Sequence, residues 1–164
     1  MYEDGQGVSQ DYTEALKWYL EAANNDVVNV EYVPIVGNGL AEKIIRYRAA
    51  SDVARAKFRV GLMYENARGV PKDYAEAMKW FSLAARQGNA NAQERLGIMY
   101  ENGLSVLQDN VLSLMWYNVG GINGATRSKR NSEYTATIMT STAVEKAQAM
   151  ARECMNSGYT KCGY

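Results

Sequence analysis

An internal repeat of 36 residues constrains the fold of this chain more than any other feature of its sequence. Residues 59–66 read RVGLMYEN and residues 95–102 read RLGIMYEN, so six of eight positions are identical. The same shift maps Trp80 onto Trp116, and further pairs follow in the same register. Because chance does not keep one register over so many positions, the chain is predicted to consist of stacked structural units.

A third copy lies at a shift of 62, which places residues 2–18 beside residues 64–80. This shift equals two periods of 36 residues minus ten residues. A shortened unit is therefore predicted between the first copy and the repeat at 54–89. An insertion of 26 residues after the first copy fits the same arithmetic, but it leaves unexplained the matches between residues 41–56 and residues 77–92 one period later. We divide the single repeat domain, 1–164, into a partial first repeat (1–26), a degenerate short repeat (27–53), two full repeats (54–89 and 90–125) and a C-terminal helical cap (126–164).

Each unit is predicted to be a helix, a turn and a second helix, which makes the protein all-α. Val60 and Tyr64 share one face of the first helix by 3.6-residue spacing, and Gly69 suits the turn. Asp73 then caps the second helix, and Asp109 does the same one period later. The three tryptophans are interpreted as packing residues: Trp18, Trp80 and Trp116.

The tail is predicted to form two closing helices, as the end of a stacked array must be covered. One runs from Arg127 to Met139. A capping box formed by Thr142 and Glu145 opens the other, which ends near Asn156.

The pattern Ala-x-x-x-Leu-Gly-x-x-Tyr-x-x-Gly, followed by Gly-Val, Asp-Tyr, Ala and Trp, resembles the Sel1-like repeat, a relative of the tetratricopeptide repeat. The first of the two full repeats carries this pattern at Gly61, Tyr64, Gly69, Asp73 and Trp80. The resemblance implies a right-handed α/α superhelix, a solenoid that serves as a non-enzymatic adaptor or scaffold for a protein or peptide partner. The tail is similar to the closing helix pair of bacterial members. Cysteine-rich relatives suggest the alternative of β-lactam binding or hydrolysis, although the chain contains neither a Ser-x-x-Lys motif nor a histidine.

The predicted binding surface is the concave groove, which the first helices of successive units line in such arrays. An Arg-Met-Asn pattern at i, i+4 and i+7 occurs identically in both full units, and arginine, methionine and asparagine suit a peptide ligand. The candidate groove residues are Arg59, Met63, Asn66, Arg95, Met99 and Asn102. For the two methionines, packing between helices is an equally good interpretation.

The start of the chain suggests a second interaction surface. Met1 falls where the first helix of a unit should end, so the first unit has a second helix without its mate. We expect the exposed edge to be closed either by the apolar run 27–36 or by a second chain, which would give a homodimer or a structural homo-oligomer. The candidate edge residues are Leu16, Tyr19, Leu20 and Tyr32.

Cys154 and Cys162 either form a disulfide that pins the tail or remain two free thiols. Similar spacing joins helices in the cysteine-rich relatives. A metal site is not expected because zinc needs four ligands and the chain has no further cysteine and no histidine. Carboxylates such as Glu65 and Glu101 recur at equivalent positions, which indicates caps and solvated faces. No catalytic residue and no cofactor are therefore predicted.

Charge and hydropathy narrow the partners further. Eighteen basic and eighteen acidic side chains balance, so no nucleic-acid surface is expected. No apolar run approaches the roughly 20 residues that span a bilayer, so no membrane insertion is expected. The first residues do not resemble a signal peptide, which favours the cytoplasm; removal of a leader would instead place the protein in the periplasm or outside the cell.

Overall fold

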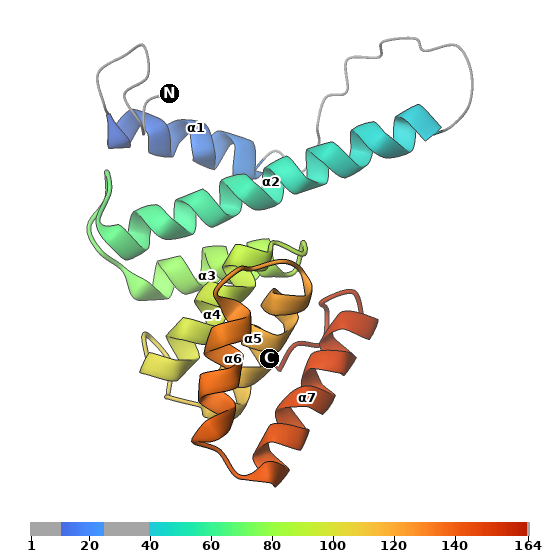
Figure 1. Cartoon of the computed structure of the whole chain (residues 1–164). Coiled ribbons are helices and arrows are strands. Elements are labelled where there is room, and N and C mark those ends of the chain that lie inside the picture. Colours follow the sequence, from blue (N-terminus) through green and yellow to red (C-terminus); the bar gives the residue numbers. More distant parts are fainter. Residues whose placement is uncertain (1–10, 25–39, 164) are drawn as a thin grey trace.

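The computed structural model describes residues 11–24 and 40–163, and it is built from α-helices stacked in an elongated array (Figure 1). No strand occurs within these two ranges. The helices are α1 (Tyr12–Asn24), α2 (Leu40–Asn66), α3 (Tyr74–Ala85), α4 (Ala90–Asn102), α5 (Asn110–Ile122), α6 (Ser128–Thr137) and α7 (Ser141–Asn156). The all-α solenoid predicted from the repeat is confirmed.

Identical aspartate caps begin the second helix of both full units. Asp73 Oδ1 accepts hydrogen bonds from the backbone N–H groups of Ala75 and Glu76 at 2.8 and 3.0 Å. Asp109 makes the same pair of bonds at the start of α5, at the same two distances. Each cap satisfies backbone donors that the helix itself leaves unpaired and stabilises it by about 1 kcal/mol. Both predicted caps are confirmed.

The first unit packs directly against the second. Ala15, Leu16 and Ala23 of α1 form one buried cluster with Ala56 and Val60 of α2. One unit later, α3 and α4 pack through the equivalent positions in the second cluster. Within the described residues, α1 therefore contacts residues 54–66 directly, as α3 contacts α4 one unit later. The division of residues 27–53, as a degenerate short repeat or as an insertion, remains a prediction.

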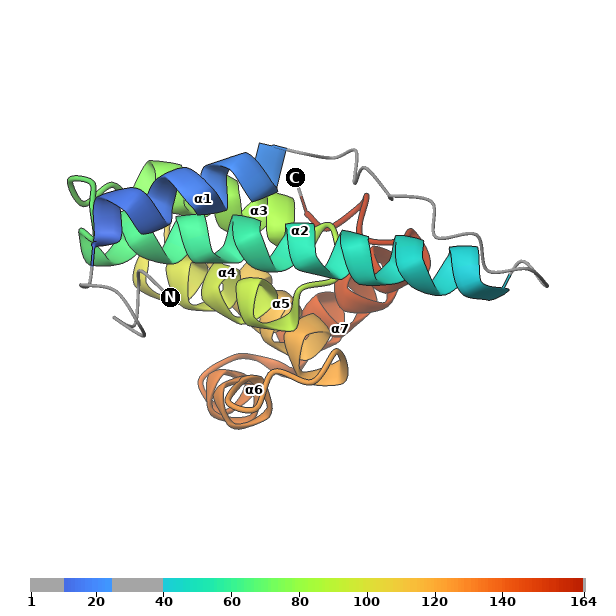
Figure 2. The same ribbon diagram turned by 90° about the horizontal axis from the view of Figure 1, so that it is seen from above.

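Helix α2 also crosses the predicted boundary between residues 53 and 54 without a turn. No glycine or proline occurs from Leu40 to Val60, so nothing in this stretch interrupts the hydrogen-bonded ladder. Its N-terminal part extends beyond the rest of the array (Figures 1 and 2). The apolar run 27–36, predicted to close the N-terminal edge, lies outside the described residues.

Glycines allow aromatic rings to lie directly on the first helix of each full unit. A Cβ atom on Gly61 would lie 2.5 Å from Cε1 of Phe81, and one on Gly97 would lie 2.6 Å from the ring of Tyr117. Both rings are completely buried. Phe81 and Tyr117 occupy equivalent positions one period apart, so the two units use the same glycine-to-ring contact.

The prediction that all three tryptophans pack is confirmed for two of them. Trp116 is fully buried, and Trp80 is half-buried against the cluster formed by α1 and α2. Trp18 is 53% exposed, so the prediction is wrong at this position. The physical reason is that Trp80 packs back onto the preceding unit, whereas the described residues place no helix beyond α1 for Trp18 to contact.

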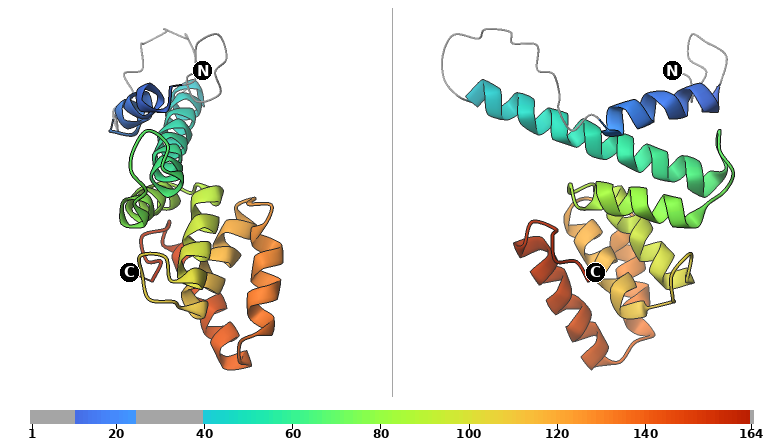
Figure 3. Two further views of the ribbon diagram at one scale, coloured as in Figure 1. Left: turned by 90° about the vertical axis from the view of Figure 1, so that its left-hand side faces the viewer. Right: turned by 180° about the vertical axis from the view of Figure 1, so that it is seen from behind.

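Two closing helices, α6 and α7, are present as predicted, although the cap of α7 differs. Thr140 Oγ1 accepts the backbone N–H of Ala143, so Thr140 is the cap and Thr142 already belongs to the helix. Both α6 and α7 pack against α5. They diverge from the loop that joins them instead of pairing closely as α4 and α5 do (Figures 1 and 3).

Candidate functional site

The methionines of the predicted groove are part of the core. Met63 is 1% exposed and Met99 is fully buried, so their place on a partner-binding surface is wrong. Met63 lies three residues after Val60, which puts both side chains on the same face of α2 and in the same cluster. The packing interpretation, left open by the sequence, is the one that holds.

An aliphatic residue three positions after each arginine lies between the arginine and the asparagine on the outer face. These residues, Leu62 on α2 and Ile98 on α4, are half-buried. Sequence reasoning missed them, although the repeat itself carried the signal, because both helices have an aliphatic residue there. We define the Arg–Asn stripe by its six members: Arg59, Leu62, Asn66, Arg95, Ile98 and Asn102.

The two asparagines of the Arg–Asn stripe make the same local contact. Asn66 is the last residue of α2, and its amide Nδ2 donates to the carbonyl oxygen of Leu62 at 2.8 Å. Asn102 ends α4 and donates to the carbonyl of Ile98, again at 2.8 Å. Both side chains are exposed. This bond uses one donor of each amide and leaves its oxygen and a second N–H for other partners.

The arginines of the stripe are half-buried, and one of them links two units. Arg95 Nη1 on α4 lies 3.4 Å from Glu65 Oε2 on α2, and the Glu65 side chain is only 11% exposed. Burial raises the pKa of the Glu65 carboxyl, while the positive charges of Arg95 and Lys72 act in the opposite direction. Glu65 is therefore neither a cap nor a solvated side chain, which corrects the prediction for the recurring carboxylates.

Its equivalent in the next unit, Glu101, joins three helices. Tyr117 on α5 donates its hydroxyl to Glu101 Oε2 at 2.8 Å, and Thr135 on α6 donates to Glu101 Oε1 at 3.3 Å. A parallel bond runs from the Ser128 hydroxyl on α6 to Glu94 on α4 at 3.3 Å. Burial, followed by the bond to Glu101, raises the pKa of Tyr117 far above its usual range. These contacts hold α4 and α6 in place beside the stripe.

The predicted N-terminal edge is largely occupied within the chain. Leu16 is only 7% exposed and packs against α2, so its role as an exposed edge residue is wrong. Tyr19 and Leu20 are half-buried and contact the same cluster. Tyr32 lies outside the described residues. Because α2 covers the side of α1 that the prediction assumed to be bare, Trp18 is the large apolar residue of α1 that remains exposed.

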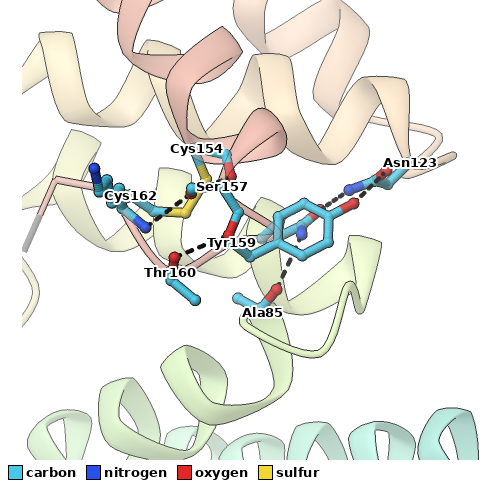
Figure 4. Close-up of a disulfide and its surroundings, with 9 residues drawn as sticks. Ala85, Asn123, Cys154, Ser157, Tyr159, Thr160 and Cys162 are labelled. Atoms are coloured by element: carbon cyan, nitrogen blue, oxygen red, sulfur yellow. Dashed lines mark hydrogen bonds between the residues drawn. A yellow bond between two sulfur atoms is a disulfide. The ribbon is translucent and has the colours of Figure 1, made fainter.

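Cys154 and Cys162 form a disulfide that closes the tail onto the end of α7 (Figure 4). Both residues are buried. Ser157 reinforces the loop, since its Oγ donates to the carbonyl of Cys154 at 2.8 Å and accepts the backbone N–H of Lys161 at 3.0 Å. Tyr159 donates its hydroxyl to Asn123 Oδ1 just after α5, at 3.1 Å. Of the two states that the sequence left open, the structure adopts the bonded one.

A shallow pocket of about 300 Å³ lies where α6 and α7 diverge over α5. In the described ranges, no group of three or more histidine, cysteine, aspartate or glutamate residues is placed to hold a metal ion. None of the described helices combines the length and the apolar character needed to cross a membrane. The predicted lack of catalytic residues remains a prediction.

The sequence matches the family model of the Sel1 repeat over residues 1–27, 54–89 and 90–118. The described parts of these three segments pack against one another in order, and residues 28–53 lie outside the match. No curated protein matches the chain.

Two similar solved structures share the fold. One is a protective antigen with an SLR fold from uropathogenic Escherichia coli, with 23% identity and a TM-score of 0.61 over 96% of this chain. The other is a Sel1 repeat protein from Oxalobacter formigenes, with 23% identity and a TM-score of 0.62 over 96% of this chain. The chain spans 37% and 62% of the lengths of these two proteins.

Proposed function

Because this chain belongs to the Sel1 repeat family, whose repeats generally mediate protein–protein interactions, we propose that it is a scaffold that binds a peptide along the Arg–Asn stripe. The partner is a protein that presents an extended segment across α2 and α4. The binding itself requires no chemical step.

The observation that carries this proposal is the identical placement of Asn66 and Asn102. Each ends the first helix of its unit, each is exposed, and each is fixed by the same 2.8 Å bond to a carbonyl four residues earlier. Such a fixed amide offers one acceptor and one donor, which is the pair that a peptide group needs. Because less side-chain freedom is lost on binding, a fixed amide binds better than a mobile one.

The neighbours of the asparagines suit the same ligand. Leu62 and Ile98 add half-buried apolar area beside each amide, and Arg59 and Arg95 add positive charge that attracts carboxylates. The ion pair of Arg95 with Glu65 connects α4 to α2, the two helices that carry the amides. A repeated set of contacts along a peptide gives affinity through several modest interactions in place of one deep pocket.

The experiment selects peptides from a random displayed library with the wild-type chain and measures their affinity by fluorescence anisotropy. We expect the double variant Asn66→Ala with Asn102→Ala to weaken binding at least tenfold, because each substitution removes a pair of hydrogen-bonding groups. The matched control is Asn24→Ala with Asn156→Ala, since these are also exposed asparagines that end helices but lie off the stripe.

Thermal denaturation of each variant verifies that the array is still folded. Equal affinities of the stripe variant and the wild type would remove the stripe from the binding surface. A charge reversal, Arg59→Glu with Arg95→Glu, provides a second test, and we expect it to reduce the affinity for acidic peptides more than for neutral ones.

A further inference from the structure

The diverging helices α6 and α7 leave a pocket that has a different character from the Arg–Asn stripe. Its floor is the C-terminal part of α5, where Tyr117 and Ile122 contribute, and its walls come from α6 and α7. In the two full units the first and second helices pack closely on each other, whereas α6 and α7 each pack mainly on α5. The pocket lies between these two closing helices, whose divergence is visible in the ribbon of Figure 3.

The lining combines apolar surface with unopposed positive charge. Ile122 is 67% exposed at the pocket, and Met155 adds a polarisable apolar side chain from α7. Lys129 on α6 and Arg152 on α7 also line it, and both are exposed. No acidic residue is among the lining residues, and neither cation has an ion-pair partner within the described part of the chain.

The volume limits what the pocket can hold. About 300 Å³ is the lower end of the range for small-molecule and cofactor pockets, which is about 300–1,000 Å³. This space takes one large side chain of a partner, and binding of such a side chain would cover Ile122 and Met155. Anchors of this kind, aromatic or large aliphatic, dominate the binding energy of many protein interfaces.

We propose that this pocket binds an acidic segment of a protein partner, in which one aromatic or large aliphatic side chain is flanked by aspartate or glutamate. The apolar side chain enters between α6 and α7 and contacts Ile122 and Met155. The flanking carboxylates bind Lys129 and Arg152 at the two walls, where the arginine can form two parallel hydrogen bonds with one carboxylate. This site is separate from the Arg–Asn stripe, because it lies on α5, α6 and α7.

The test uses the whole chain and a blocked, fluorescein-labelled peptide, Glu-Asp-Trp-Leu-Glu-Asp, whose ends are acetylated and amidated. Fluorescence anisotropy gives its affinity, and we expect binding that weakens as salt is added. A peptide with lysine in place of every acidic residue should bind at least tenfold more weakly. Equal binding of the acidic and basic peptides, or no binding of the acidic peptide at millimolar protein, would overturn the proposal.

Variants connect the binding to the pocket. Lys129→Ala with Arg152→Ala should weaken the acidic peptide about tenfold, because two charge-assisted contacts are lost. Both side chains are exposed, so the fold should be unaffected, and thermal denaturation verifies this. Lys146→Ala is the matched control, an exposed cation on α7 that does not line the pocket. An equal loss in the control would show that only overall charge is being measured.

Two further arms identify the ligand group and separate this site from the stripe. A peptide whose single carboxylate is its free C-terminus tests whether the pocket binds a C-terminal carboxylate in place of acidic side chains. If this peptide binds more tightly than the blocked acidic peptide, the proposed ligand is wrong.

The variant Asn66→Ala with Asn102→Ala should bind the acidic peptide as the wild type does. A loss in that variant would place the peptide on the stripe and refute the pocket, whereas the proposed function would stand.

Discussion

Replacement of Tyr117 by phenylalanine isolates one hydrogen bond between helices, because the repeat itself supplies the comparison. The equivalent residue one unit earlier is Phe81, whose ring lies on Gly61 as the ring of Tyr117 lies on Gly97. A phenylalanine therefore fits this environment without rearrangement. The substitution removes only the hydroxyl that donates to Glu101 at 2.8 Å.

The expected cost follows from the type of bond and its surroundings. Hydrogen bonds to charged groups contribute about 1.5–3 kcal/mol to stability. Glu101 is half-buried and keeps its bond from Thr135, so the loss should lie at the lower end, about 1.5 kcal/mol. For a chain of 164 residues this corresponds to a fall in melting temperature of about 4 °C.

Urea denaturation followed by circular dichroism at pH 7 measures the change in the free energy of unfolding. Alkaline pH provides a second test. Because the pKa of Tyr117 is raised in the folded protein, the wild type loses stability as the pH rises above about 10, where tyrosine in the unfolded chain begins to ionise. The phenylalanine variant lacks this group, so the difference between the two proteins should narrow above pH 10.

The reverse substitution, Phe81→Tyr, is the companion experiment. By the symmetry of the two units, the added hydroxyl should reach Glu65 as that of Tyr117 reaches Glu101, and the variant should gain up to about 1 kcal/mol. If Tyr117→Phe changed the free energy of unfolding by less than 0.5 kcal/mol, roughly the scatter of surface substitutions, the reasoning would be refuted. A loss in Phe81→Tyr would show that the two rings do not lie equivalently.

Two further predictions concern the tail and the buried carboxylate. The variant Cys154→Ser with Cys162→Ser should lose about 2–3 kcal/mol in the free energy of unfolding, measured by urea denaturation, since the disulfide closes a short loop in the unfolded chain. The reduced wild type should show the same loss. Unchanged stability in both proteins would contradict this prediction. Glu65→Gln should be more stable than the wild type at pH 7 but not at pH 4. Burial raises the pKa of the Glu65 carboxyl, so the wild type loses stability as the pH rises through that pKa, whereas glutamine does not ionise. Urea midpoints at both pH values test it, and a less stable variant at pH 7 would mean that the pair with Arg95 outweighs the cost of burial.

Much of the local structure could be predicted because it depends on neighbouring residues in the sequence. An aspartate followed by a helical pattern is sufficient for the caps at Asp73 and Asp109, whose hydrogen bonds span only two or three residues. The glycines at 61 and 97 and the rings at 81 and 117 recur with the period, so their contacts recur as well. The arginines and asparagines of the candidate site were selected from the sequence because they recur at equivalent positions of both full units.

The predictions that failed concern which helix packs against each face of its neighbours. Periodicity places Met63 one turn from Arg59, but it does not say that α1 lies against that side of α2. The direct contact of α1 with residues 54–66 was not predicted either, because the first copy does not follow the 36-residue period. Trp18 is exposed for the same reason, because its environment depends on a helix beyond α1.

The sequence by itself determined the period, the helix pairs, the caps and the family of this protein, because each depends on residues close together in one unit. Only the tertiary structure decided that α1 packs directly on residues 54–66, that the methionines are core residues, that Cys154 and Cys162 are joined, and that α6 and α7 diverge over a cationic pocket. These features depend on how helices pack across units, and packing depends on contacts between residues that the repeat pattern does not relate to one another.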